Sequence, residues 1–151
     1  MYNIFKVKGA ILIVLSCDHA GFDYVQKLMK YFDKCGLEYK YLGPTEYNGE
    51  DDYPDFIHPA CKEVLKSVDN CGIFMCGSGA GANMVANRYK GIRAICANDT
   101  VEAFFARKDE DANVLTIGSR FVSFRKAIKI IQIFLTSEFE GGRHARRIAK
   151  Y

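Results

Sequence analysis

Short apolar runs alternate with amphipathic segments along this chain, and this alternation is the feature that most restricts its fold. The run GAILIVLSC at residues 9–17 is continuous and rich in β-branched residues, which is typical of a strand buried on both faces. The segment at residues 22–36 follows, with apolar residues at helical spacing and Gly36 placed to cap a helix. The beginning of the chain therefore predicts a strand that leads into a helix.

The same alternation continues towards the end of the chain. The further predicted strands span residues 37–43, 71–76, 91–97 and 113–118. The further predicted helices run from Pro54 to about Val68, from a glycine-rich turn to about Tyr89, from Asp99 or Thr100 to about Lys108, and over residues 123–137. Five strands that alternate with five helices predict an α/β fold, in which helices cover both faces of a five-stranded parallel sheet.

The 151 residues are enough for one domain with a full hydrophobic core. We expect an N-terminal extension at residues 1–9, an α/β domain at residues 10–137 and a basic C-terminal tail at residues 138–151. The net charge of +3 is small and no basic stripe is interleaved with aromatic residues, so we expect no binding to nucleic acid. The apolar run AILIVL follows two lysines, as in an export signal. It has only six residues, fewer than the roughly 7–15 of a signal peptide or the roughly 20 of a membrane span.

The cysteine pattern predicts reduced thiols in a cytoplasmic protein. No two of the six cysteines form a C-x-x-C pair, and most of them lie in apolar surroundings. The three histidines have no metal-ligand spacing, so we expect no metal site. These residues are Cys17, Cys35, Cys61, Cys71, Cys76, Cys96, His19, His58 and His144.

Ligands of parallel α/β sheets bind at the carboxyl ends of the strands, and this chain places reactive side chains there. Asp18 and His19 follow the first predicted strand, Cys76 ends the third, and Arg120 follows the fifth. A carboxylate, an imidazole, a thiol and a guanidinium are therefore expected on one edge of the sheet. Simpler interpretations stay open for two of them, since Asp18 is also placed to cap the next helix and His19 to be a half-buried structural imidazole.

The turn MCGSGAGAN at residues 75–83 holds three glycines within five residues, Gly77, Gly79 and Gly81. A turn from a strand into a helix presents backbone N–H groups that bind an anion or a charge that develops during a reaction. Cys76 lies directly before the glycines, and a thiol beside a helix N-terminus ionises readily enough to act as a general base. The alternatives are a turn that serves only packing and a cysteine that is a small buried apolar residue. The other five cysteines are interpreted as structural.

Basic residues gather in the tail, in the stretch GGRHARRIAK. Arg143 and Arg147 are four residues apart, so a helical turn puts both on one face, where two guanidinium groups suit a phosphate dianion. The charge pattern alone favours a solvated helix end whose cations complement the helix dipole. A tail that follows the last element is also able to reach a neighbouring subunit.

Five stretches, taken in order and spacing, resemble the type B ribose-5-phosphate isomerases, which belong with the galactose-6-phosphate isomerase subunits. The stretches are SCDHAGF, DYPDF, CGSGAGANMVANRYKGIRA, DANVL and EFEGGRHARR, and the resemblance extends from about Ile11 to Lys150. It implies a Rossmann-like three-layer sandwich and a homodimer or dimer of dimers with the active site at the subunit interface. It also implies interconversion of ribose 5-phosphate and ribulose 5-phosphate in the pentose phosphate pathway, without a metal or an organic cofactor.

The resemblance also assigns roles to residues. Cys76 matches the base that moves a proton between C1 and C2 of the sugar, and Gly77, Gly79 and Gly81 with Ser78 match the loop that stabilises the enediolate. The ligand-binding positions are Asp18 at the sugar hydroxyls, His19 near the phosphate, and Arg120, Arg143 and Arg147 at the phosphate, the last two from the partner subunit. For the tail, the phosphate-binding role that the resemblance implies replaces the solvated helix end that the charge pattern alone favours.

The chain departs from the family pattern directly before DANVL, where the family usually has His-Asn and this chain has Asp109 and Glu110. The family histidine helps to open the sugar ring, and the asparagine contacts the substrate. We expect Asp109 to retain part of the acid–base role and Glu110 to occupy the substrate-contact position. The alternative is that Asp109 has no part in the reaction and Asp18, another group or solvent opens the ring.

Three other functions stay open. The first is the same isomerisation of a hexose 6-phosphate, such as that of galactose or allose. Only the size of the substrate pocket would distinguish such an enzyme from a pentose-phosphate isomerase. Dinucleotide binding is the second, because GSGAGA satisfies G-x-G-x-x-G/A and Asp99 lies 22 residues beyond Gly77, although the motif follows the third strand rather than the first. The third is a subunit that binds a sugar phosphate without catalysis. The departure from the family pattern at Asp109 and Glu110 is the reason to consider it.

Overall fold

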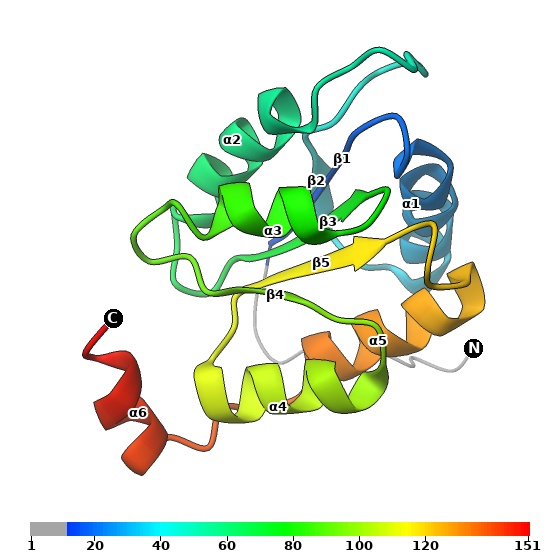
Figure 1. Ribbon diagram of the computed structural model, residues 1–151. Helices are drawn as coiled ribbons and strands as arrows, with labels where there is room; N and C mark the ends of the chain where they lie inside the picture. The colour runs from blue at the N-terminus through cyan, green and yellow to red at the C-terminus, as the bar shows by residue number, and fades with distance from the viewer. Residues whose placement is uncertain (1–11) are drawn as a thin grey trace.

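The computed structural model describes residues 12–151, and a sheet of five parallel strands forms its centre (Figure 1). The strands are β1 (Ile13–Cys17), β2 (Tyr39–Tyr41), β3 (Cys71–Cys76), β4 (Ala94–Cys96) and β5 (Val114–Gly118). They lie in the order β2-β1-β3-β5-β4, and every neighbouring pair is parallel. The predicted five-stranded parallel sheet is confirmed.

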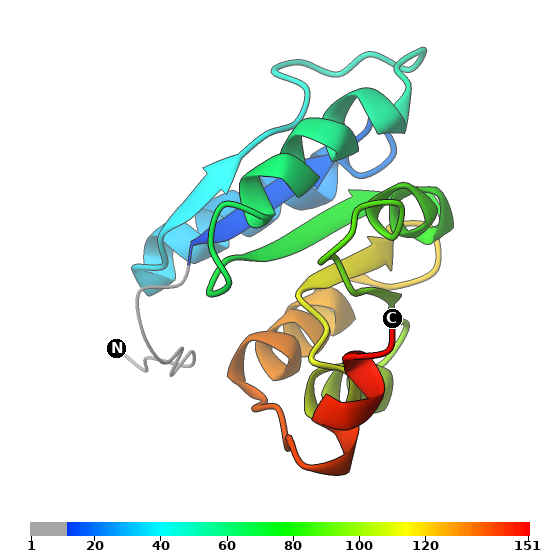
Figure 2. The ribbon, with the colours of Figure 1, turned by 90° about the vertical axis from the view of Figure 1, so that its left-hand side faces the viewer.

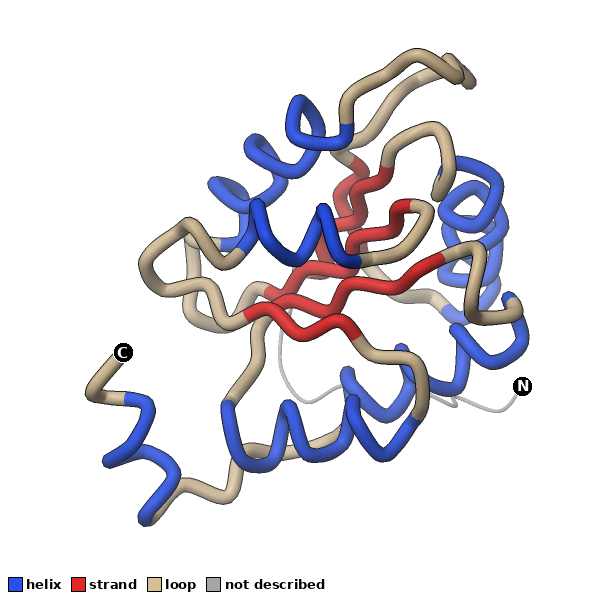
Figure 3. Tube along the Cα trace, viewed as in Figure 1, coloured by secondary structure: helices blue, strands red, loops and turns tan. Residues whose placement is uncertain are grey.

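Helices cover both faces of this sheet (Figure 3). They are α1 (Phe22–Cys35), α2 (Tyr53–Val64), α3 (Ala80–Ala86), α4 (Thr100–Glu110), α5 (Phe124–Thr136) and α6 (Arg143–Ile148). One apolar core lies between the sheet and helices α1, α4 and α5, and a second lies between the sheet and helices α2 and α3. The α/β three-layer architecture predicted from the alternation is therefore confirmed.

The two cores explain why β1 reads as a continuous apolar run. Ile13, Leu15 and Cys17 pack in the first core, whereas Val14 between them packs in the second. Successive side chains of a strand point to opposite faces, so a strand covered on both sides is apolar at every position. The remainder of the predicted strand at residues 9–17 and the proposed extension at residues 1–9 fall mostly or wholly outside the described residues.

The predicted helix ends are confirmed at three positions. Gly36 adopts a left-handed conformation with φ of 68° at the C-cap of α1, and Pro54 lies in the first turn of α2. The side chain of Asp99 accepts hydrogen bonds from the N–H groups of Val101 and Glu102 at the start of α4.

Other predicted boundaries are wrong by several residues. The two edge strands, β2 and β4, are three residues each rather than the predicted 37–43 and 91–97. Helix α3 ends at Ala86 rather than near Tyr89, because the Asn87 amide bonds both the N–H and the carbonyl of Ala94, each at 2.9 Å. Helix α2 ends at Val64 rather than near Val68, and there Asn70 Nδ2 donates to the carbonyl of Glu63.

The tail at residues 138–151 contains a short helix, α6, that lies beside the C-terminal end of α4 (Figure 2). The N–H of Glu140 donates to the carbonyl of Lys108 at 2.9 Å and holds the beginning of the tail against α4. Within residues 12–151, no helix combines the length and the apolar composition that a bilayer span requires.

Candidate active site

The carboxyl ends of β1, β3 and β5 are joined by hydrogen bonds between their loops. The N–H of Asp18 donates to the carbonyl of Met75, and the N–H of Ser119 donates to the carbonyl of Cys76 at 3.0 Å. The hydroxyl of Ser119 also donates to the carbonyl of Ala20 at 2.6 Å. The three loops therefore form one rigid edge on which the reactive side chains are fixed.

Cys76 ends β3 on this edge, and its side chain is almost completely buried. The N–H of Gly79 donates a hydrogen bond to its Sγ at 3.1 Å. Gly79 has φ of 79°, a left-handed conformation that favours glycine. The sulfur is therefore a hydrogen-bond acceptor with a fixed position at this edge, and Cys76 is more than a buried apolar residue.

The glycines of the turn meet protein groups at close range. A Cβ on Gly77 would lie 2.9 Å from Cζ of Arg120, and a Cβ on Gly81 would lie 2.7 Å from the ring of Tyr53. The packing interpretation of the turn is therefore correct for these two positions. It also has a functional consequence, because the missing side chain of Gly77 lets the Arg120 guanidinium lie against the turn.

Two backbone N–H groups of the same turn make no hydrogen bond to the described part of the chain. Among residues 12–151, the N–H groups of Gly77 and Ser78 have no protein acceptor, whereas the N–H of Ala80 donates to Ser78 Oγ at 3.2 Å. The Ser78 side chain itself is exposed. This arrangement fits donors for a charge that develops next to Cys76.

Asp18 and His19 lie on the same edge, at the end of β1. Asp18 is buried, and its Oδ1 accepts the N–H of Gly21 at 3.1 Å. Gly21 is itself the N-cap of α1, which has no side-chain cap, so the capping interpretation of Asp18 is wrong. Burial raises the pKa of the Asp18 carboxyl. The hydrogen bond between His19 Nδ1 and Asp51 Oδ1, at 2.6 Å, raises the pKa of the His19 imidazole, and the Arg120 charge opposes that rise.

Four of the other cysteines have surroundings that do not suit a general base. Burial raises the pKa of Cys17, Cys61 and Cys71 to about 12 in each case, and it raises the pKa of Cys96 as well. Such thiols stay protonated at neutral pH, which fits their interpretation as structural residues.

Four predicted site residues lie at the opposite, amino-terminal edge of the sheet, and the chain does not bring them to Cys76. Asp109 and Glu110 end α4, while Arg143 and Arg147 belong to α6 (Figures 1 and 2). The carbonyl of Glu110 accepts Nε of Arg93, just before β4 begins. A single subunit therefore holds two separate groups of the predicted residues.

Ion pairs and hydrogen bonds hold these residues in place. Asp109 Oδ1 lies 3.6 Å from Nε2 of His144, which is buried, and 4.0 Å from Nζ of Lys108. The Glu110 carboxylate accepts the hydroxyl of Tyr151. These contacts tie the end of α4 to the tail.

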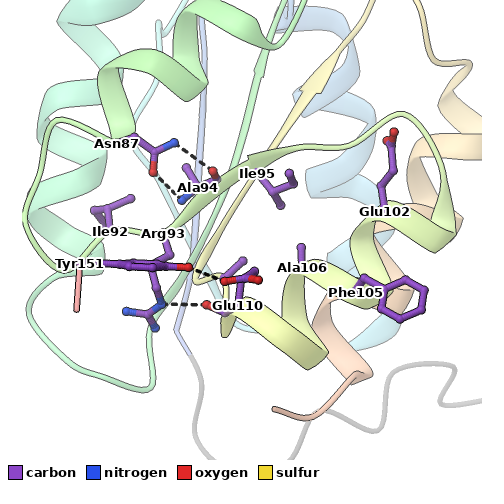
Figure 4. A pocket seen from close by; sticks show the side chains of 11 residues that line it. Asn87, Ile92, Arg93, Ala94, Ile95, Glu102, Phe105, Ala106, Glu110 and Tyr151 are labelled. Carbon is purple, nitrogen blue, oxygen red and sulfur yellow. Dashed lines mark hydrogen bonds between the residues drawn. The ribbon is translucent and has the colours of Figure 1, made fainter. Parts of the chain in front are cut away.

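A cavity of about 480 Å³ lies beside this group, between α4 and the edge strand β4 (Figure 4). Ile95 and Phe105 form part of its apolar wall, and Tyr151 and Glu110 meet at one end. Cys76 is not among its lining residues, so this cavity is not the place where the thiol meets a substrate.

Comparison with known proteins gives one consistent result. Residues 13–151 match the family described as Ribose/Galactose Isomerase. The chain belongs to this family. A probable ribose-5-phosphate isomerase B of Mycoplasma pneumoniae is 40% identical over 138 residues, which are 91% of each chain. Ribose-5-phosphate isomerase B of Escherichia coli is 33% identical over 90% of this chain and 91% of its own.

Solved structures of the ribose/galactose isomerase family agree with this assignment. The ribose-5-phosphate isomerase B of Mycoplasma genitalium, solved with bound ribulose-5-phosphate, superposes with a TM-score of 0.90. It is 38% identical, and the match covers 93% of each chain. The resemblance to type B ribose-5-phosphate isomerases noted from the sequence is confirmed, and so is the Rossmann-like fold.

Dinucleotide binding does not fit this ribose/galactose isomerase. Asp99, at the spacing of a ribose-binding acid, uses its carboxylate to cap α4. The glycine turn follows β3, at the centre of the sheet, rather than a first strand that opens a nucleotide-binding half. The G-x-G-x-x-G/A match is therefore coincidental.

Two groups of acids and a histidine have donor atoms within 4.8 Å of one another in the described chain: Asp18, His19 and Asp51, and Asp109, Glu140 and His144. In the first, Oδ1 of Asp51 already accepts the backbone N–H of His19 and lies 2.6 Å from Nδ1 of the same residue, so the oxygen that a cation would need is in use. In the second, Nζ of Lys108 lies 3.3 Å from Glu140 and occupies the position of a cation. Both groups are better described as ion-pair clusters.

Sequence reasoning missed one residue of this edge, Asp51, and placed a second, Ser119, at a strand end without giving it a role. Asp51 lies in a polar loop with two other acids, and nothing local distinguishes it from Glu50 or Asp52. Its contact with His19 spans 32 positions along the chain. Ser119 lies beside Arg120 directly after a predicted strand, so the expectation that ligands bind at the carboxyl ends of strands already pointed to its position.

Proposed function

We propose that this chain is an aldose–ketose isomerase that interconverts ribose 5-phosphate and ribulose 5-phosphate through an enediolate, with Cys76 as the base. The observation that carries the proposal is the hydrogen bond from the Gly79 N–H to Cys76 Sγ, because it fixes the position of the sulfur at the ligand-binding edge of the sheet. Family membership and the ribulose-5-phosphate bound to the Mycoplasma genitalium relative support the substrate.

The proposed reaction is a proton transfer between adjacent carbons. The Cys76 thiolate takes the proton from C2 of the open-chain aldose, the electrons of that C–H bond form the C1–C2 double bond, and O1 gains the negative charge. The same sulfur returns its proton to C1, while the O2 hydroxyl loses its proton and C2 becomes the carbonyl carbon. The proton from O2 passes to O1, so the atoms and electrons balance.

The glycine turn stabilises the negative charge of this intermediate. In the described part of the chain, the N–H groups of Gly77 and Ser78, directly after Cys76, have no protein acceptor. Loss of one such donor in other enzymes lowers the rate by about 10²–10³. Ser78 adds a hydroxyl on the exposed side of the turn, and Gly79 and Gly81 allow the chain to form it.

Three charged residues bind the rest of the substrate. Asp18, buried at the end of β1 next to β3, contacts the sugar hydroxyls and exchanges protons with them because burial raises its pKa. Arg120 lies against Gly77, and its charge acts on His19. Together Arg120 and His19 form the part of this edge that binds the phosphate.

The complete site contains residues of two subunits. Asp109, Glu110, Arg143 and Arg147 lie at the edge of the sheet opposite Cys76, so a homodimer, alone or within a dimer of dimers, is required to bring them to a substrate. Exposed apolar side chains on α4, among them Phe104 and Phe105, support a contact surface near these residues. The two tail arginines then bind the phosphate in the partner's site.

Asp109 retains part of the ring-opening role that a histidine has in the family. Its carboxylate lies beside His144 and Lys108, both of which are possible proton donors to it. Glu110 occupies the neighbouring substrate-contact position. Two acids near an anionic substrate weaken binding, and the paired tail arginines offset that repulsion.

This reaction needs neither a metal nor an organic cofactor, because one carbon is oxidised as its neighbour is reduced. The six free thiols support a reducing, cytoplasmic location. Turnover by the purified chain without any addition is therefore the expected result.

The test is conversion of ribose 5-phosphate, galactose 6-phosphate and allose 6-phosphate by the purified chain. Ribulose 5-phosphate formation with a higher kcat/KM than either hexose reaction is the expected result. A higher kcat/KM for a hexose phosphate would change the proposed substrate and leave the proposed reaction unchanged. Thermal protection by sugar phosphates without turnover of any of them would instead indicate a binding subunit without catalysis.

A further inference from the structure

Asp51 makes two hydrogen bonds to one residue on the ligand-binding edge. Its Oδ1 accepts the backbone N–H of His19 at 3.0 Å and lies 2.6 Å from Nδ1 of the same residue. The Asp51 side chain is only 7% exposed, and its second oxygen, Oδ2, is buried with no hydrogen-bond partner among residues 12–151. The two hydrogen bonds of Oδ1 tie the polar loop to the end of β1 at His19.

The contact fixes the tautomer of His19. A carboxylate oxygen is only an acceptor, so the 2.6 Å contact requires a proton on Nδ1 of the imidazole. Nε2 is then the ring nitrogen available to a ligand. The Tyr47 ring packs edge-on against the imidazole, with 6.3 Å between ring centroids, and also against Phe22. Both contacts restrict the orientation of the imidazole.

The groups around His19 shift the pKa of its imidazole in opposite directions. Asp51 and Asp18 favour the imidazolium, whereas burial and Arg120 oppose it, and the hydrogen bond to Asp51 is the largest of these influences. An imidazolium has an N–H at Nε2, which suits the phosphate of the substrate. A neutral imidazole with its proton on Nδ1 has only a lone pair there.

We propose that Asp51 is a positioning residue, which holds His19 with its proton on Nδ1 and keeps Nε2 a donor to the anionic end of the substrate. This inference rests on the proposed function only for the identity of that anion. Asp51 acts through His19 and does not touch the substrate. The same relationship, an acid that orients a working histidine, recurs in metal sites and catalytic triads.

The test compares Asp51→Asn with Glu50→Gln. Asparagine keeps an acceptor oxygen for His19 and removes the charge, while Glu50→Gln removes the same charge from an exposed position one residue away. The first measurement is the titration of the His19 imidazole by NMR, with the signal assigned from His19→Gln. The pKa of His19 is expected to fall in Asp51→Asn and to stay at its wild-type value in Glu50→Gln.

The second measurement is the KM for ribose 5-phosphate between about pH 6 and pH 8. At a pH between the His19 pKa values of the two proteins, the KM of Asp51→Asn is expected to rise about tenfold with a smaller change in kcat, because its His19 is then neutral while that of the wild type is charged. Towards pH 6 the difference narrows as His19 gains its proton in both proteins. Inhibition by inorganic phosphate follows the same pattern, since it tests the anion site alone.

An unchanged His19 titration in Asp51→Asn would overturn the proposal, and so would a KM profile equal to that of Glu50→Gln. Circular dichroism melting of each variant separates these results from misfolding. If wild-type protein converted no sugar phosphate, the proposed function would fail. The His19 titration and phosphate binding would still decide the role of Asp51.

Discussion

The backbone N–H of Gly79 lies 3.1 Å from Sγ of Cys76 and donates a hydrogen bond to it. The contact depends on the left-handed φ of 79° at Gly79, which a residue with a Cβ rarely adopts. One turn residue therefore supports the reactive sulfur and also sets the path of the chain into α3.

Substitution of Gly79 tests this dependence. In Gly79→Ala the new Cβ would lie 2.7 Å from Cys96 Sγ and 2.9 Å from the Gly118 nitrogen, so we expect loss of both stability and turnover. Gly36→Ala is the matched control, since it has a similar φ of 68° with nothing within 4 Å. The control should lose only about 1–2 kcal/mol of unfolding free energy and keep its activity. Equal urea-unfolding curves and equal turnover for the two variants would contradict this account.

Asp18 gives a prediction for the pH dependence of stability. Burial raises its pKa in the folded state, so the folded protein favours the protonated carboxyl, and stability from this group is lost as pH rises through the folded pKa. Asp18→Asn is therefore expected to stabilise the protein at neutral pH and to have less effect below the pKa of an unfolded aspartate, while turnover falls. Urea unfolding at several pH values measures this. A variant less stable than wild type at neutral pH would show that the contact with Gly21 outweighs burial.

Asp109 tests the departure from the family pattern. Asp109→Ala removes the carboxylate beside His144, and Asp109→His restores the family residue. We expect kcat with ribose 5-phosphate, which is mostly cyclic, to fall in the first variant and to differ from wild type in the second. Stopped-flow or coupled assays measure both. The same rate in all three proteins would remove Asp109 from the mechanism.

Mixed dimers test whether the two edges of the sheet meet across subunits. Cys76→Ala subunits have an intact tail, and Arg143→Ala/Arg147→Ala subunits have an intact thiol. Each hybrid dimer then holds one complete site, so equal mixing after unfolding and refolding should restore about one quarter of wild-type activity. Each variant alone stays inactive or weak. Activity no higher than the mean of the two separate variants would contradict a shared site.

The sequence was sufficient for the residues that follow the central strands. Buried parallel strands read as apolar runs, and whatever follows them lies at the carboxyl edge, so Asp18, Cys76 and Arg120 were found without a structure. The alternation of strands and helices also gave the correct layers. The edge strands β2 and β4 were predicted too long, because apolar composition does not reveal where hydrogen-bonded pairing stops.

Other parts of the site depend on contacts between distant segments. The sequence did not single out Asp51 among three adjacent acids, because only the folded loop brings it to His19. The sequence also did not reveal that Asp109 and Cys76 lie at opposite edges of the sheet. That separation follows from α4, which runs from the carboxyl edge back to the amino-terminal edge of the sheet and carries Asp109 in its last turn.

The most direct test of the account is the turnover of Cys76→Ala with ribose 5-phosphate, compared with Cys35→Ala. Cys35 is a half-buried cysteine at the end of α1, away from the ligand-binding edge. We predict that Cys76→Ala loses at least about 10²–10⁴ in kcat, as expected for a general base, and still binds sugar phosphate, whereas Cys35→Ala keeps wild-type activity. Substantial turnover by Cys76→Ala would contradict the account and would place the base elsewhere.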